Sequence, residues 1–184
     1  MIGASFLRLF LWIAGVAALG GIGRSAMAQV VWDGSTSLAA SGLGGDTVNP
    51  GITLSITTAA DHDYYNTTIV NNGIVNWSGG ALRSGNSGSI TNNNQWNDSA
   101  SGSYVYIIAG NAPYFLNSVS GVYTKSAAGT TLFAAPVPLY NDGLINVLAG
   151  TLELNGGGVN SSTGAINTAV GATTQFSNSY SLAE

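Results

Sequence analysis

A short segment built around Asn and Gly returns along this chain at a nearly fixed interval. It first reads Ile69-Val70-Asn71-Asn72-Gly73-Ile74-Val75-Asn76, and it returns at residues 90–97, 139–146 and, more loosely, 162–167. The turn falls at positions 73, 94, 143 and 164, and a degenerate copy at Gly121 makes the steps 21, 27, 22 and 21 residues. A repeat of this length is typical of proteins built from stacked coils.

Within each repeat, apolar and polar residues alternate over short runs bounded by Gly, Asn and Ser. Such alternation indicates β-strands with one buried face. One predicted set of strands follows the Asn/Gly turn, at residues 74–77, 95–97, 122–124, 144–147 and 165–168. A second set follows a glycine, at residues 52–56, 130–133, 151–154 and 172–176.

About 21 residues with short strands cannot bury an apolar face alone, so neighbouring repeats must stack. Coiling the chain once per repeat places equivalent strands above one another as parallel ladders around a shared core. We therefore predict an all-β fold, a single-stranded right-handed parallel β-helix (solenoid) of about five to six coils, because parallel crossovers prefer the right hand. The alternative is an antiparallel sandwich with Asn-Gly hairpins, but hairpins do not require one fixed period.

The turn asparagines predict a stacked corner. Asn tolerates the backbone conformations of a tight corner, and Asn ladders stabilise stacked parallel strands through side-chain amide bonds. We expect the structural Asn corner to consist of Asn71, Asn92, Asn117 and Asn141.

The N-terminus has the pattern of a secretory signal peptide. Arg8 precedes an apolar run over residues 9–19, and Ala26-Met27-Ala28 forms a small-x-small cleavage site. The run is shorter than the roughly 20 residues that a membrane-spanning helix needs, although an uncleaved anchor is the alternative. We predict a signal peptide at 1–28, an N-terminal capping segment at 29–45 and β-helix repeats over 46–184. The expected location is secreted or cell-surface, with no membrane-spanning segment in the mature chain.

The charge pattern excludes several partners. Beyond residue 28, Arg83 and Lys125 are the only basic residues against 8 acidic ones, a formal net charge of 2 minus 8, or −6. Nucleic acid is excluded because phosphate binding needs clustered Lys or Arg. The sequence has no Cys, which excludes disulfides and thiolate metal sites. We expect Arg83 and Lys125 to be surface residues that aid solubility.

The single histidine lies in Asp61-His62-Asp63, which invites comparison with a metal site. In an extended chain, however, Asp61 and Asp63 share a face that His62 does not. We therefore predict a solvated loop at this position, with no metal, no cofactor and no catalytic residue in the chain. A polysaccharide lyase or hydrolase is the less favoured alternative, since glycoside hydrolysis usually needs paired carboxylates flanking one bond.

Aromatic residues give a carbohydrate-binding alternative. The segment from Ser103 to Tyr114 accompanies the 27-residue step, and insertions in solenoids often form the binding face. Tyr104, Tyr106 and Tyr114 are the candidate ligand contacts, whereas Trp77 and Trp96 are expected in the core. No segment after Phe176 is long enough to cover the last coil, so we expect this end to stack on another chain or on further repeats.

The strings Asn71–Gly80, Trp96–Ala100 and Asn146–Gly158 resemble the repeats of secreted bacterial adhesin-like β-helix proteins, including autotransporter passenger domains. The resemblance covers roughly residues 46–176. It implies a right-handed β-helix outside the cell, in adhesion or surface structure, with host or surface glycans or proteins as partners. The function expected from the sequence is a non-enzymatic extracellular structural or adhesin-like module.

Overall fold

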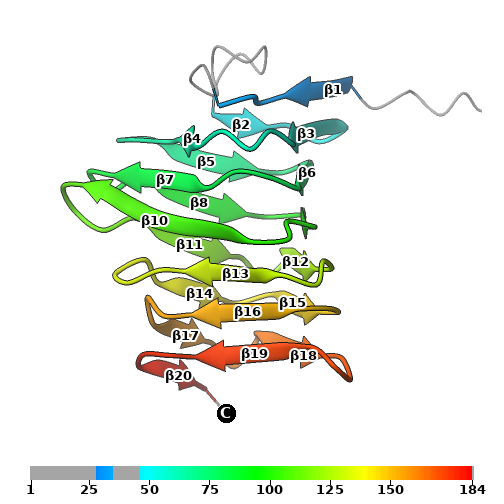
Figure 1. Cartoon of the computed structure of the whole chain (residues 1–184), viewed down its shortest axis with the longest axis vertical. Helices are drawn as coiled ribbons and strands as arrows, with labels where there is room; N and C mark the ends of the chain where they lie inside the picture. The colour runs from blue at the N-terminus through cyan, green and yellow to red at the C-terminus, as the bar shows by residue number, and fades with distance from the viewer. Residues whose placement is uncertain (1–27, 35–45, 184) are drawn as a thin grey trace, which may run out of the picture.

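Three parallel β-sheets, which we call A, B and C, run along the long axis of the molecule (Figure 1). The computed structural model describes residues 28–34 and 46–183, and every regular element in these residues is a strand. No helix in this part of the chain is long and apolar enough to cross a lipid bilayer. The described structure is therefore all-β, as predicted.

In each sheet the strands follow one another in chain order, from the N-terminal to the C-terminal end of the stack. Sheet A contains β1 (Ala28–Val31), β3 (Ile52–Ile56), β6 (Ile74–Trp77), β9 (Gln95–Asp98), β12 (Val122–Lys125), β15 (Leu144–Val147) and β18 (Ala165–Thr168). Sheet B contains β2 (Thr47–Val48), β5 (Thr68–Asn71), β8 (Ser89–Asn92), β11 (Tyr114–Asn117), β14 (Leu139–Asn141), β17 (Gly158–Asn160) and β20 (Tyr180–Leu182). Sheet C contains β4 (His62–Asp63), β7 (Leu82–Gly85), β10 (Ser103–Ala109), β13 (Thr130–Phe133), β16 (Thr151–Leu154) and β19 (Thr173–Phe176).

Along the chain, the strands alternate between the sheets in the order B, A, C, so each turn of the chain adds one strand to every sheet. The pairings between successive coils are parallel in all three sheets. This is a parallel β-solenoid of about 7 turns, slightly more than the five to six coils predicted. The difference arises because β1 already pairs with β3, and because β20 starts a further turn by pairing with β17.

Most of the N-terminal segment lies outside the described residues. Of the predicted signal peptide, residues 1–28, only Ala28 is described, and it begins β1 opposite Ile52. Of the predicted capping segment, residues 29–45, the structure describes 29–34. Gln29 to Val31 belong to β1, and Trp32 is fully buried at the N-terminal end of the core.

Each coil has three strands, where the sequence pattern predicts two recurring sets. The strands predicted after the Asn/Gly turn form sheet A, and those at 130–133, 151–154 and 172–176 correspond to β13, β16 and β19 of sheet C. The predicted strand at 52–56 is β3, which belongs to sheet A because Leu54 aligns with Val75 of β6. Sheet B consists of the short apolar runs that precede the turn.

Alternate side chains of all three sheets meet in one core. Phe115 of β11 lies at the centre of its aromatic part, with ring centroids 5.2 Å from Trp96, 5.7 Å from Tyr123 and 5.5 Å from Phe133. All three contacts are edge-to-face, a geometry that adds about 0.5–1.5 kcal/mol per pair beyond the burial of apolar area. Since these rings come from sheets A, B and C, the cluster ties the three sheets together.

The additional residues of the 27-residue step lie on all three sides of the coil, and not only in the predicted segment from Ser103 to Tyr114. Aligned residues of sheets A and C are Trp77 and Leu82 in one coil but Asp98 and Val105 in the next, which is two residues more. Between sheets C and B, one added residue is a bulge within β10, where the register shifts between Ile107 and Ala109, and one lies in the corner. The corner from B to A lengthens by two residues. The other additions fall in corners, so the strands of sheets A and B keep their register through this step.

Candidate functional site

A ladder of asparagines runs along the corner at which sheet B ends. Nδ2 of each Asn donates to Oδ1 of the next, over 2.7 Å from Asn71 to Asn92, 2.8 Å from Asn92 to Asn117, 2.8 Å from Asn117 to Asn141 and 2.6 Å from Asn141 to Asn160. The first four are fully buried. The structure thus brings together the four predicted corner residues and adds Asn160, which the prediction omits.

The same amides also hold the corner that follows. Nδ2 of Asn71 donates to the carbonyl oxygen of Gln95 over 2.8 Å, and Nδ2 of Asn117 to that of Leu144 over 3.1 Å. Each acceptor is the first residue of a sheet A strand in the next coil. The buried amides of the ladder therefore bind backbone carbonyl groups as well as one another, which is the condition for burying an amide at low cost.

A second polar cluster lies inside the core around Asp98 of β9. Its Oδ2 accepts hydrogen bonds from Tyr123 Oη over 2.7 Å and Thr131 Oγ1 over 2.6 Å, and its Oδ1 accepts one from the backbone N–H of Ala100 over 3.0 Å. Asp98, Tyr123 and Thr131 are all fully buried. Burial raises the pKa of Asp98, and the hydrogen bond from Thr131 is the largest effect opposing it.

Lys125 lies inside this part of the core, so the prediction of a surface lysine is wrong. It is fully buried and aligns with Asp98 across β9 and β12. Its Nζ donates to the carbonyl oxygens of Ala100 over 2.8 Å and Ala127 over 2.9 Å. Burial lowers the pKa of Lys125, and the nearby Asp98 charge opposes that shift. The residue follows the alternation of β12, in which Tyr123 and Lys125 both face inward.

His62 is also buried, and the solvated loop predicted for this position is wrong. The residue forms strand β4 with Asp63, and its ring meets Trp32 edge-on with centroids 5.0 Å apart. Nε2 lies 3.0 Å from the carbonyl oxygen of Trp32, which can only accept, so Nε2 carries the proton. Nδ1 has no hydrogen-bond partner among the described residues.

We expect acidification to destabilise the fold through His62. Burial lowers its pKa below the ordinary value of 6.5, so the unfolded chain binds a proton more readily than the folded chain. The contribution of neutral His62 to the free energy of unfolding is complete above pH 6.5 and is lost as pH falls from there through the folded-state pKa. For one proton, the slope is at most about 1.4 kcal/mol per pH unit. Thermal unfolding between about pH 7.5 and 5.5 measures this slope, and His62→Phe should flatten it. An unchanged slope in His62→Phe would contradict the assignment.

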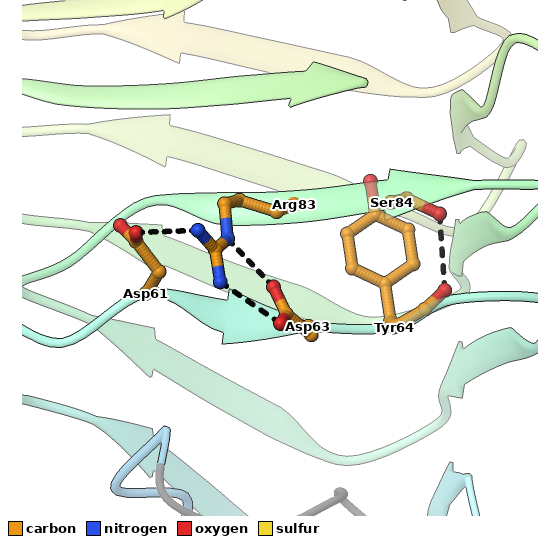
Figure 2. Close-up of polar contacts among 5 residues, drawn as sticks. All are labelled: Asp61, Asp63, Tyr64, Arg83 and Ser84. Atoms are coloured by element: carbon orange, nitrogen blue, oxygen red, sulfur yellow. Dashed lines mark hydrogen bonds and ion pairs between the residues drawn. The ribbon is translucent and has the colours of Figure 1, made fainter. Parts of the chain in front are cut away.

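Arg83 lies on the outer face of sheet C, whereas Lys125 points from sheet A into the core, so these two basic residues share no face. Its Nε and Nη2 bind Asp63 Oδ1 and Oδ2 over 2.7 and 2.9 Å, and its Nη1 lies 2.8 Å from Asp61 Oδ2 (Figure 2). The hydrogen bond to Asp63 is the main reason that the pKa of Arg83 rises above its usual value. Asp61 and Asp63 do share a face, as predicted from the extended chain, and both bind the same guanidinium.

The three candidate tyrosines lie on two different faces. Tyr104 and Tyr106 belong to β10 in sheet C, while Tyr114 belongs to β11 in sheet B. Tyr104 is 53% exposed, and Tyr114 is 38% exposed and lies 6.1 Å, ring centre to ring centre, from Tyr140 of β14. Trp77 and Trp96 are buried in the core.

The C-terminal end of the described stack is open. A cavity of about 390 Å³ is lined by Asn160, Ile166, Thr168, Thr174, Phe176 and Leu182. Phe176 is 42% exposed, whereas Leu154, its aligned neighbour in the preceding coil, is fully buried. The expectation that this end stacks on another coil stays a prediction.

Sequence reasoning missed the buried cluster of Asp98, Tyr123, Lys125 and Thr131. The available signal was the side-chain alternation, since Asp98 is two residues after the buried Trp96 and Lys125 two after Tyr123. Among the described residues, no three His, Cys, Asp or Glu side chains lie close enough to hold a metal ion. The polar groups that are brought together are instead used to join the coils.

These features define the class to which the chain belongs: a parallel β-solenoid whose coils are joined by an internal asparagine ladder. Comparisons of the chain with protein-family models, with curated proteins and with solved structures gave no match.

Proposed function

We propose that this chain is a non-enzymatic structural or adhesin-like module that acts outside the cell. The observation that carries the proposal is the continuous asparagine ladder, which joins five successive coils from Asn71 to Asn160. Together with three continuous sheets it produces a rod that keeps its shape without disulfides. A rod of this kind holds its outer faces at fixed positions, which is what a surface or adhesive component requires.

Two features of the sequence support an extracellular role. Residues 1–28 have the pattern of a cleaved secretory signal, and the repeats resemble those of secreted bacterial adhesin-like β-helix proteins. Cleavage after Ala28 would leave Gln29, Val30 and Val31 to pair with β3, so the mature chain retains most of β1.

Three of the acidic residues that a polysaccharide lyase or hydrolase could use have other partners. Asp98 is buried and accepts hydrogen bonds from Tyr123 and Thr131. Asp61 and Asp63 lie on the surface, but both bind Arg83. These contacts favour the non-enzymatic function over the hydrolytic alternative.

Expression of the full chain in a bacterial host tests the proposal. We expect an exported product whose N-terminal sequence begins at Gln29, and Ala26→Asp combined with Ala28→Asp should block that cleavage. The exported chain should release no new sugar ends from soluble polysaccharides. A product retained in the cytoplasm would overturn the extracellular role, and turnover of a polysaccharide would overturn the non-enzymatic role.

A further inference from the structure

The outer face of sheet C carries two tyrosines on its longest strand. Tyr104 and Tyr106 are two positions apart in β10, so both side chains leave the same side of the sheet, while Val105 between them is fully buried in the core. Tyr104 is 53% exposed and Tyr106 is half-buried. The ring of Tyr104 therefore has a face available to a ligand.

Tyr106 continues a row of polar side chains across three strands. It aligns with Arg83 of β7, and Arg83 aligns with Asp63 of β4. Figure 2 shows the guanidinium held between Asp61 and Asp63. A hydrogen bond with Tyr106 adds to the effect of Asp63 in raising the pKa of Arg83. Parallel strands and these contacts hold the row in place before any ligand arrives, which lowers the entropy lost on binding.

The chemistry of this row suits a polyhydroxylated ligand. The carboxylates of Asp61 and Asp63 each have lone pairs beyond those that Arg83 uses, so they can accept hydrogen bonds from hydroxyl groups. The carboxylates of Asp61 and Asp63 together with the guanidinium of Arg83 have a formal charge of only −1, so this group does not favour a strongly charged partner. A tyrosine offers a large apolar face with a polar end. The C–H face and hydroxyl rim of a pyranose ring match that arrangement.

A protein partner fits the same face less well. Specific protein interfaces usually bury more than about 1,000 Å² around an apolar centre. On the strands of sheet C, the exposed large apolar side chains among the described residues are Tyr104, Ile108 and Phe176. Phe176 belongs to the open end of the stack, three strands from β10. The face around β10 thus has separate rings among polar groups, and no broad apolar centre.

We propose that Tyr104 and the row formed by Asp63, Arg83 and Tyr106 bind a neutral oligosaccharide. Tyr104 stacks on one pyranose ring, and the carboxylate oxygens of Asp63, two strands away in sheet C, accept hydrogen bonds from the hydroxyls of a neighbouring sugar of the same oligosaccharide. The inference rests on the proposed adhesive function and gives it a ligand class and a place on the molecule.

A binding assay with defined sugars tests this site. The exported full-length product is titrated with cellotetraose, mannotetraose and N-acetylchitotetraose, and polygalacturonate serves as an acidic comparison. We expect saturable binding of at least one neutral tetrasaccharide. Tyr104→Ala combined with Tyr106→Ala should weaken it at least tenfold without changing the thermal unfolding midpoint. Tyr106→Phe should retain more affinity than Tyr106→Ala because it keeps the ring.

The matched control removes two tyrosines from another face. Tyr114→Ala combined with Tyr140→Ala takes away two exposed rings of sheet B, each 38% exposed, and should leave the affinity unchanged. The proposed site is overturned if no neutral tetrasaccharide binds, if only polygalacturonate binds, or if both double variants weaken binding equally. Export and the absence of polysaccharide turnover are measured separately, so the site can fail while the proposed function stands.

Discussion

Replacing Asn117 with alanine is expected to lower the free energy of unfolding by about 3–5 kcal/mol, because it removes the central member of the ladder. The change leaves Asn141 Oδ1 without its donor from the ladder. It also leaves Asn92 Nδ2 with only the longer contact, 3.4 Å, to the carbonyl oxygen of Val122, and both Asn side chains are buried. It also removes the bond to the carbonyl oxygen of Leu144. Urea-induced unfolding measures the loss.

Asn97→Ala is the matched control for this variant. Asn97 donates one hydrogen bond of 2.9 Å to Asn76, also across two coils, but the pair is only partly buried. Water can replace the lost partner there, so we expect a cost of no more than about 1 kcal/mol. Equal losses in the two variants would show that the buried ladder has no special part in stability.

Asp98→Ala should lower the free energy of unfolding by a similar amount, about 3–5 kcal/mol, for a different reason. It leaves the Tyr123 hydroxyl, the Thr131 hydroxyl and the N–H of Ala100 without an acceptor in the core. It also takes away the negative charge nearest to the buried Lys125. Equilibrium unfolding at pH 7, followed by the fluorescence of the buried tryptophans, measures the change.

Two further variants separate hydrogen bonding from charge at this position. Asp98→Asn keeps one carbonyl acceptor but not the charge. Its free energy of unfolding should therefore lie between those of the unchanged chain and Asp98→Ala. Glu153→Gln on the outer face of sheet C should change stability by no more than about 0.5 kcal/mol. If Asp98→Ala were as mild as Glu153→Gln, the internal cluster would not be a determinant of stability.

The stacking of the coils could be predicted because its causes are local. An Asn at one corner and strands of alternating character recur within about 21 residues, and parallel stacking follows from the length of the repeat. The division into three sheets was harder to see. The strand β5 is only 4 residues long and is followed within two residues by β6, so the pattern merges them into one segment around the turn.

The buried charges could not be predicted in the same way. Whether Lys125 faces the core depends on acceptors that come from other coils, such as the carbonyl oxygen of Ala100, 25 residues away. Thr131 and Asp98 are 33 residues apart. The alternation of β12 points Lys125 inward, but a charged side chain is expected inside only when its partners are known. His62 is a similar case, because Trp32 lies 30 residues before it.

The candidate ligand contacts show a third limit of prediction from the sequence. Tyr104, Tyr106 and Tyr114 are close in sequence, yet a corner lies between β10 and β11 and sends Tyr114 to another face. Such a change of direction depends on how residues 110–113 turn. Spacing along the chain therefore indicates that exposed rings are present but not which of them can contact one ligand.

The three lengthened corners of the 27-residue step also bear on how such a chain can change in size. Adding residues at a corner leaves every strand opposite its former neighbour, as the alignment of Asn92 with Asn117 demonstrates. A single residue added within a strand would turn each following side chain to the other side of the sheet unless a bulge accommodates it, as between Ile107 and Ala109 of β10. Duplication of one whole repeat would lengthen the rod while leaving the ladder and all three sheets continuous. The architecture thus tolerates growth at a corner, by a complete coil, or by a bulge near the end of a strand, as in β10.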